Sequence, residues 1–388
     1  MSRTSKKRRD LKKRRRGPRA IKHPEPARLF KIFAPWELHT YDDGQRMMLL
    51  KLNTQKCGAL FDKKGVPIGP NDDRSDMAMA GNLFSDKPPE YRGVRDWFGI
   101  GDHRGLGLSG MEEFRYEAWL KAYDANKDYI KLSAADVPHE RVCYIAAEGP
   151  SITQNGFHLA DVRRGVTLAV NRVPKLFNMD FDYWLAIDFK FDFSDNTGPY
   201  PNTVALLDTC SNPALRQIGW KEVRWFCPDY DAGHPVYDRV LEENPWIARY
   251  DAGLNCTFQA FGWACRSLLG CRSDIPRERM RAENKGKTIV LVGFDHCFTF
   301  GQNRAGAWLK PGDVSHETVQ FAVDTLGRLV MTNRILRDQS QWMMAACYFA
   351  RDAGIRVINA TEGGLLSHHC EQMTLEDAVK ELNAEGGE

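Results

Sequence analysis

The distribution of hydrophobic residues changes about a third of the way along the chain. From about residue 139 onward, short apolar runs bounded by Gly, Asp or Asn recur at intervals. Runs of this length are typical of strands that are buried on both faces of a parallel sheet. The pattern predicts strands over residues 142–147, 166–170, 183–187, 223–227, 288–292 and 355–358.

Longer apolar segments fit helices between these strands, over residues 257–269 and 334–353. Strands that alternate with helices predict a doubly wound α/β domain with a mostly parallel sheet. In such sheets, ligands bind outside the carboxyl ends of the strands. The C-terminal ends of the predicted strands are therefore the places to search for chemistry.

The residues before this pattern divide into two further parts. Residues 1–28 hold too few apolar residues to bury a core and predict a disordered arm, while residues 29–138 are rich in Asp, Gly and Pro. We expect the second part to be an accessory or lid region with a helix near residues 112–123. The predicted α/β domain then spans 139–370, and a C-terminal helix and tail span 371–388.

Charge separates the arm from the rest of the chain. The 388 residues have a formal net charge of +3, but residues 1–22 hold twelve Lys and Arg against one Asp. A run of this kind binds phosphate backbones, anionic surfaces or import receptors, and a solubilising tail is an equally good interpretation. The basic residues at its centre are Lys6, Lys7, Arg8, Arg9, Lys12, Lys13, Arg14, Arg15 and Arg16.

Cysteine spacing and hydropathy argue against some classes of protein and indicate a cellular compartment. None of the 10 Cys residues forms a Cys-x-x-Cys pair, so the usual zinc-site spacing is absent. No apolar run reaches about 18 residues, which argues against a membrane-spanning helix. Several cysteines lie inside apolar runs, as buried thiols do, and the N-terminus has no apolar secretion signal. We expect a cytoplasmic protein with reduced thiols, in which the arm would also act as a nuclear import signal in a eukaryotic host.

Polar residues follow most of the predicted strands. The first strand ends in Glu148, Gly149, Pro150 and Ser151, a turn that suits a phosphate at the start of a helix and equally suits an ordinary helix cap. Further candidates, which can bind a ribose, a base, a metal or an anion or serve only as caps, are Asn171, Asp188, Asn255, Asp295, Thr361, Glu362, Gly363 and Gly364. Of these, the run 359–364 is the one that favours a binding loop over a simple turn.

Two histidines are candidates for a general base. His296 follows the strand at 288–292, and His316 lies just beyond a Gly-rich segment that could close over a site. A neutral imidazole accepts a proton from an attacking hydroxyl near pH 7. A loop histidine is more often exposed and without a role, so the sequence leaves both assignments open.

The order of these motifs resembles the 6-hydroxymethylpterin diphosphokinase MptE-like superfamily. The resemblance covers residues 140–367 and looks most like the branch of motility accessory factor (Maf) glycosyltransferases, because of the run 359–364 with Asp324, Gly327 and Thr332 before it. A looser likeness extends to bacterial sialyltransferases that use CMP-activated sugars. The resemblance implies a Rossmann-like domain that binds a nucleotide or a nucleotide-sugar.

Carried over by position, the resemblance implies roles for individual residues. Gly149, Pro150 and Ser151 would contact phosphate, and Asn171 and Asp188 would line the nucleotide pocket. His316 stands in a place comparable to the loop base of the sialyltransferases, and we expect His316 and Asp295 to be the catalytic residues. The remaining residues that would complete the site are Asn255, Asp295, Thr361, Glu362, Gly363 and Gly364.

The chain departs from the family pattern at three places. Leu254 stands where the family commonly has a second Gly, and Met343 and Met344 replace an acidic residue. A charged insertion at 272–285 separates the helix at 257–269 from its strand. These departures concern the substrate and the activity rather than the fold.

Three functions remain open at this point. The first is a glycosyltransferase, which needs no metal if the donor is a CMP-activated nonulosonate. The second is an ATP-dependent diphosphokinase, which requires Mg²⁺ with Asp188 and Asp295 as ligands. The third is a nucleic-acid-associated or assembly protein without catalytic activity, whose arm, residues 1–22, binds a polyanion.

Overall fold

The computed structural model describes part of the chain. The described residues are 36–40, 46–50, 60–61, 67–68, 109–187, 198–229, 235–251, 255–271, 275–299, 302–305, 307–308, 319–367 and 369–384. The predicted arm and most of the predicted accessory region lie outside them. The predicted domain boundaries therefore remain predictions.

The centre of the molecule is a 9-stranded sheet in which every pair of neighbours is parallel. This confirms the predicted α/β fold class with a doubly wound sheet. In spatial order, the strands are β10 (Ala248–Asp251), β9 (Trp220–Asp229), β8 (Tyr200–Asp208), β7 (Tyr183–Ala186), β6 (Val166–Val170), β5 (Val142–Ala146), β11 (Thr288–Val292), β16 (Arg356–Asn359) and β17 (Glu371–Gln372).

The strand order creates a topological switch point between β5 and β11. From β5 the chain builds outward through β6 to β10 and then returns to place β11 on the other side of β5. In open α/β sheets, ligands bind outside the carboxyl ends of the strands at such a switch point, because the crossovers on its two sides leave the sheet in opposite directions. The loops that follow β5 and β11 are thus neighbours, although they are far apart in sequence.

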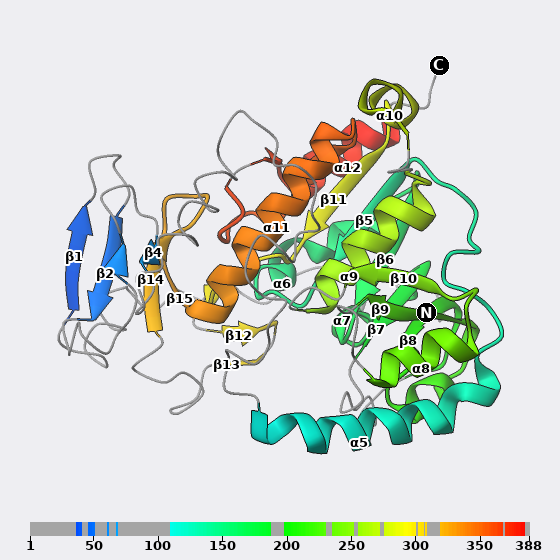
Figure 1. Cartoon of the computed structure of the whole chain (residues 1–388). Coiled ribbons are helices and arrows are strands. Elements are labelled where there is room, and N and C mark those ends of the chain that lie inside the picture. Colours follow the sequence, from blue (N-terminus) through cyan, green and yellow to red (C-terminus); the bar gives the residue numbers. More distant parts are fainter. Residues whose placement is uncertain are drawn as a thin grey trace, which may run out of the picture.

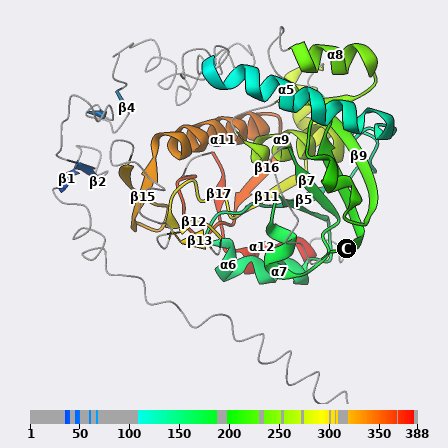
Figure 2. The ribbon, with the colours of Figure 1, turned by 90° about the horizontal axis from the view of Figure 1, so that it is seen from below.

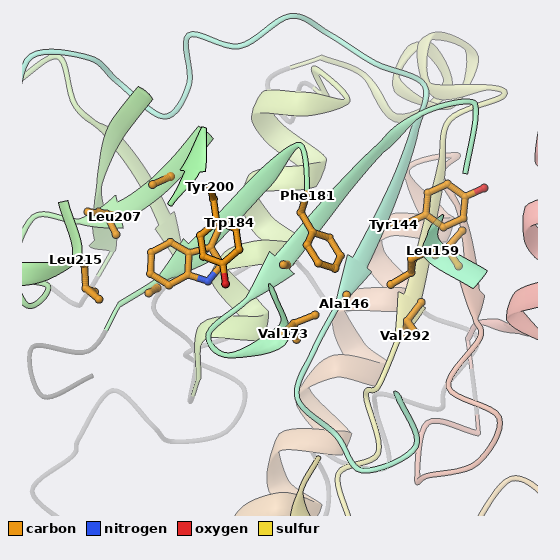
Figure 3. Packing of buried hydrophobic residues seen from close by; sticks show 14 of the residues in the cluster. Tyr144, Ala146, Leu159, Val173, Phe181, Trp184, Tyr200, Leu207, Leu215 and Val292 are labelled. Atoms are coloured by element: carbon orange, nitrogen blue, oxygen red, sulfur yellow. The ribbon is translucent and has the colours of Figure 1, made fainter. Parts of the chain in front are cut away.

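Successive residues along a strand face opposite sides of the sheet, and two buried clusters follow from this alternation. On β5, Tyr144 and Ala146 belong to one cluster, and Cys143 and Ile145 belong to the other. Figure 3 shows part of the first cluster, in which Trp184 and Tyr200 lie beside the sheet with Phe181 and Val292. Because both faces are covered by apolar residues, continuous apolar runs were the correct signal for these strands.

Helices cover both faces of the sheet. Figure 2 shows α9 (Cys256–Trp263) and α11 (Arg334–Asp352) on one side, and α6 (Ile152–Asn155), α7 (Val173–Phe177) and α12 (Leu375–Ala384) on the other. A π-helical turn, η5 (Ala264–Leu268), continues α9. The remaining helical elements are α5 (Ser109–Asn126), η2 (Lys127–Tyr129), η3 (Gly156–Asp161), η4 (Pro213–Gln217), α8 (Pro235–Glu243) and α10 (Arg277–Asn284).

Helix α5 shows how part of the predicted accessory region contacts the sheet domain. Tyr123, near its C-terminal end, is fully buried and belongs to the first apolar cluster. The Tyr123 hydroxyl donates a hydrogen bond to Glu243 Oε2 of α8 at 2.7 Å. The chain then adds Ser133 beside Trp225 of β9 as an isolated parallel bridge. These residues therefore pack as one body with the sheet.

Short two-stranded sheets are also present, and their labelled strands lie to the left of the main sheet in Figure 1. Their strands are β1 (Trp36–Thr40) with β2 (Arg46–Leu50), β3 (Leu60–Phe61) with β4 (Pro67–Ile68), β12 (Gln302–Arg304) with β13 (Ala307–Trp308), and β14 (Val319–Val323) with β15 (Leu329–Asn333). The β14–β15 hairpin follows the loop after β11 and also contacts β2. None of the helices in the described ranges has the length and apolarity to span a bilayer.

The charged insertion predicted within 272–285 contains α10. This helix contacts the C-terminal end of α11, where Arg281 Nη2 lies 2.6 Å from Asp352 Oδ1. Arg277 approaches the same carboxylate. Asn284 Nδ2 also donates to the carbonyl oxygen of Ala353 at 2.8 Å. The insertion is thus a helix that docks on α11 and directly precedes the amino end of β11, opposite the carboxyl end that the polar loops follow.

Candidate functional site

The loops after β5 and β11 meet at the switch point with no side chain between their backbones. Gly149 N donates to the carbonyl oxygen of Gly293 at 2.9 Å, and Ala147 N donates to that of Val292 at 2.8 Å. A Cβ atom at Gly149 would lie 2.1 Å from Asp295 Oδ2 and 2.2 Å from the Gly293 oxygen. Only glycine permits this approach, which explains the Gly-Pro-Ser turn in structural terms.

Ser151 and Asp295 connect the same two loops through side chains. Ser151 Oγ donates to Asp295 Oδ2 at 2.7 Å, and Ser151 N lies 3.2 Å from Oδ1 and 3.3 Å from Oδ2. The hydroxyl and the backbone N–H of Ser151, which the sequence suggested as phosphate ligands, therefore both face the Asp295 carboxyl group. The sequence predicted that Ser151 and Asp295 belong to one site, but it did not indicate that they would form a hydrogen bond with each other.

Burial changes the acidity of Asp295. The residue is 1% exposed, and its removal from water raises the pKa from 3.8 to about 6. Hydrogen bonds from Thr299 and Ser151 and the positive charge of Arg328 oppose this rise in the pKa. The carboxyl group thus lies beneath the loops with a pKa close to neutrality.

A third loop, residues 361–364 after β16, completes the arrangement. Thr361 Oγ1 accepts a hydrogen bond from Phe294 N at 3.0 Å, and Leu365 N donates to the carbonyl oxygen of Asp295 at 2.9 Å. Gly364 has a φ of 75°, and a Cβ there would lie 2.6 Å from the Asp295 oxygen. The three loops are therefore held against one another by backbone contacts.

Glu362 of this loop binds protein groups in the structure. Its Oε1 accepts hydrogen bonds from Asn155 Nδ2 and from Leu375 N, each at 3.0 Å. Leu375 is the first residue of α12, so its N–H has no partner within the helix and the Glu362 carboxylate accepts a hydrogen bond from it. The negative charge of Glu362 also lies at the positive end of the helix dipole, which is favourable. This contact attaches the third loop to the C-terminal helix.

Arg328 is a cation at this site that the sequence did not single out. It follows the turn of the β14–β15 hairpin, where its Nε donates to Asp324 Oδ2 at 2.7 Å. Its Nη2 lies 3.4 Å from the carbonyl oxygen of Glu362, and a Cβ at Gly363 would lie 2.1 Å from that nitrogen. Only the motif at Asp324 and Gly327 pointed to this hairpin, because Arg328 lies 35 residues before Gly363 in sequence.

Glu148 orients the loop after β6. Its Oε1 accepts a hydrogen bond from Arg172 N at 2.6 Å, and its carbonyl oxygen accepts from Ala305 N at 2.8 Å. Burial raises the pKa of Glu148, while the Arg172 N–H and the charge of Arg304 lower it. The β12–β13 hairpin, which contains Arg304, is thereby attached to the end of β5.

Asn171 and Asn255 meet at the first turn of α9. Asn171 adopts a left-handed φ of 53° and donates from Nδ2 to Cys256 Sγ at 3.1 Å. Asn255 is the N-cap of α9, and its Oδ1 accepts from Thr257 N at 3.0 Å. The predicted nucleotide-pocket residue Asn171 is therefore next to the start of α9, while the side chain of Asn255 caps that helix.

His296 lies beside Asp295 in an unusual backbone conformation. Its φ of 52° is rare for a residue with a side chain, and it is only 8% exposed. Burial lowers its pKa to about 4, so the ring is neutral near pH 7. Its Nε2 is buried without a hydrogen-bond partner among the described residues.

Several predicted residues lie outside the described ranges. Asp188, His316, Leu254 and the basic residues of the arm are among them, so their roles stay predictions. Met343 and Met344 are described. Both are buried on α11 within the second apolar cluster, which also contains Phe294 and Leu366.

The switch-point carboxyl group does not fit the expected environment of a Mg²⁺ ligand. Mg²⁺ binds exposed carboxylates and retains several waters, whereas Asp295 is 1% exposed and both its oxygens accept hydrogen bonds from Ser151. Among the residues that the structure describes, no three or more His, Cys, Asp or Glu side chains gather as a metal site would require.

Comparisons with known proteins add one structural likeness. No family model and no curated protein matches the chain. Among solved structures, it is similar to the MAf glycosyltransferase from Magnetospirillum magneticum AMB-1, with 13% sequence identity and a TM-score of 0.45. The match covers 69% of this chain and 41% of that protein, so this chain spans less than half its length. The α/β fold is established by the chain's own sheet.

Proposed function

We propose that the chain is a transferase that binds a nucleotide-activated sugar at the switch point and transfers the sugar to a hydroxyl acceptor. The observation that carries the proposal is the meeting of three loops, from β5, β11 and β16, at the switch point of a parallel sheet. Glycines at 149, 293 and 364 bring backbone close to backbone in these loops, and Gly363 lies against the side chain of Arg328. Sheets of this class bind their ligands in this crevice, and the family resemblance of the motifs supports the same site.

Arg328 is the group that we assign to the phosphate of the donor. Its side chain is 35% exposed, next to Gly363, and Asp324 holds its orientation through Nε and Nη2. A guanidinium in a fixed orientation suits a phosphate because its planar donors match two phosphate oxygens. The phosphate acquires charge when the sugar leaves, and a positive group at that point stabilises the leaving group.

Asp295 has a positioning role in this scheme. It is buried beneath Gly149 and Gly364, so it acts through Ser151 and the backbone rather than on the substrate. Its hydrogen bonds hold the first turn of α6 against the loop after β11. We therefore assign general-base chemistry to another residue.

The finer parts of the proposal rest on the resemblance of the sequence. We propose a donor of the CMP-nonulosonate type and His316 as the base. His316 accepts the proton of the acceptor hydroxyl, the acceptor oxygen bonds to the anomeric carbon, and the bond from that carbon to the phosphate oxygen breaks. CMP leaves with the electron pair. This scheme requires no metal cofactor.

The first test is a thermal-shift experiment on the full chain with CMP, CDP, UDP, GDP and ATP, each with and without Mg²⁺. A ligand at about 100 times its Kd adds roughly 2.7 kcal/mol of stability, which gives a clear increase in Tm. We expect CMP to stabilise the chain without Mg²⁺. Stabilisation by ATP only with Mg²⁺ would instead support the diphosphokinase, and no stabilisation by any of the five would overturn nucleotide binding.

A variant at Arg328 locates the ligand at the switch point. The double substitution Arg328→Gln with Asp324→Asn removes the whole ion pair, so no buried carboxylate is left unpaired. We expect the Kd of CMP to rise about tenfold, as for the loss of a charged hydrogen bond. The matched control is Arg239→Gln with Asp124→Asn, a pair at 3.0 Å whose arginine is 36% exposed. An equal Kd in both variants would contradict the assignment.

A further inference from the structure

The start of α9 lies at the carboxyl ends of the strands, on the side of β6 and β7. Asn255 caps the helix, which packs on β6, β7 and β10. The contact from Asn171 Nδ2 to Cys256 Sγ, at 3.1 Å, fixes the first turn beside the end of β6. The Trp263 ring packs on Tyr183 of β7, with 4.8 Å between the ring centroids.

These two contacts define the side of α9 that faces the sheet. Residues three, four and seven positions apart lie on one side of a helix. Gln259 is three residues after Cys256 and four before Trp263, so it belongs to this side. It lies one turn nearer to the strand ends than Trp263 does.

Gln259 is completely buried, and its amide makes no hydrogen bond within the described part of the chain. Its exposure is 0%, and neither Oε1 nor Nε2 has a partner there. Buried polar side chains in folded proteins nearly always have a partner, because an unpaired buried amide lowers stability. An amide held in this state at the strand ends is suited to a ligand that supplies both a donor and an acceptor.

We propose that the Gln259 amide binds the edge of the nucleobase of the donor nucleotide. An amide presents an acceptor oxygen beside a donor nitrogen, and the hydrogen-bonding edge of a nucleobase presents the complementary pair. Asn171, which the sequence predicts to line the nucleotide pocket, contacts the same helical turn. This inference rests on the proposed function, because it names a recognition residue for the same ligand.

The test is the variant Gln259→Met in the full chain, since Met has a similar length and no polar amide. Two results are expected together. The Tm of the free protein rises, because the unpaired amide is removed, and the Kd of the nucleotide that stabilises the wild type rises about tenfold or more. The control is Gln217→Met, which changes an exposed glutamine on η4 and leaves both quantities unchanged.

Ribose 5-phosphate separates base recognition from a change of shape. It has the sugar and the phosphate of a nucleotide but lacks the base, so we expect Gln259→Met to bind it as well as the wild type does. An equal loss of affinity for ribose 5-phosphate would overturn the assignment, as would a lower Tm in the free variant.

The outcomes distinguish this inference from the proposed function. If the wild type binds a nucleotide and Gln259→Met binds it equally well, the proposed function stands and the role of Gln259 is overturned. If the wild type binds no nucleotide, the proposed function fails, and base recognition fails with it.

Discussion

Two groups of polar side chains lie at the carboxyl ends of the strands, and they differ in how their hydrogen bonds are satisfied. At the switch point, Ser151, Asp295 and Thr361 bond to one another's loops. At the first turn of α9, the amide of Gln259 is buried without a partner in the described residues. The first group holds loops together, whereas the second lowers stability as long as no ligand is bound.

Burial of a polar residue therefore has no fixed effect on stability. Removal of a satisfied group leaves its partner unpaired and lowers the free energy of unfolding, whereas removal of an unsatisfied group increases it. The sign of the stability change on substitution therefore distinguishes residues that hold the loops in place from residues whose hydrogen-bond partner is a ligand. Gln259→Met, for which we expect an increase in Tm, tests the unsatisfied group, and the variants below test the satisfied groups.

Among variants of the switch-point loops, we expect the largest loss of stability at Gly364. Gly364 and Gly327 have almost the same φ, 75° and 76°, but a Cβ at Gly364 would lie 2.6 Å from the Asp295 oxygen while one at Gly327 has nothing within 4 Å. Gly364→Ala should therefore lower the free energy of unfolding by roughly 2 to 5 kcal/mol through backbone strain and crowding. Urea denaturation measures it.

Gly327→Ala is the matched control, because it adds the same backbone strain without the crowding. We expect it to cost about 1 to 2 kcal/mol. If both variants lost the same stability, the close contact between the third loop and Asp295 would be wrong.

The next effect concerns the pH dependence of stability through Asp295. Its pKa is raised from 3.8 to about 6 in the folded state, so the folded chain holds this proton more tightly than the unfolded chain does. The stabilisation is complete below the unfolded value and is lost as the pH rises through the folded value. This term should amount to about 3 kcal/mol.

The measurement is the free energy of unfolding across this pH range, in wild type and in Asp295→Asn. The variant has no proton to lose, so the wild type minus variant difference should fall as the pH rises and then level off above the folded pKa. A difference that rises with pH would show that burial does not control this carboxyl group.

A smaller effect is expected at Thr361. Thr361→Val keeps the shape of the side chain but leaves Phe294 N without its acceptor, at a cost of about 1 to 3 kcal/mol. Thr361→Ser retains the hydroxyl and should lose less. Thermal unfolding compares the stability of the three proteins. A Val variant as stable as the wild type would show that Thr361 does not help to hold the loops together.

The sequence predicted most of the central sheet because buried parallel strands are apolar along their whole length. All six predicted strands are present, and the helices predicted near 112–123, 257–269 and 334–353 correspond to α5, α9 with η5, and α11. Two of the strands that were missed lack the signal, because β10 has the sequence Ala-Arg-Tyr-Asp and β17 is two exposed residues. β8 does contain a short apolar run, Val204 to Leu207, but its first half includes the exposed residues Pro201 and Asn202, and the prediction missed it.

The candidate site was predictable only in its location. The rule on strand ends brings Gly149, Ser151, Asp295 and Thr361 to one place, and the structure places them in contact. The pairing within that place depends on distances between loops that no local pattern encodes. Neither the approach of Arg328 to Gly363 nor the lack of a partner for the Gln259 amide within the described ranges could be predicted from their neighbours in sequence.

The contacts at the switch point also have a consequence for folding kinetics. Ser151 and Asp295 are separated by 144 residues, and Asn155 and Glu362 by 207. Contacts of such long range close large loops, and chains dominated by them fold slowly. During synthesis from the N-terminus, β5 to β10 are made before β11, β16 and α12 emerge. The three loops at the switch point therefore come together only after β16 has been made.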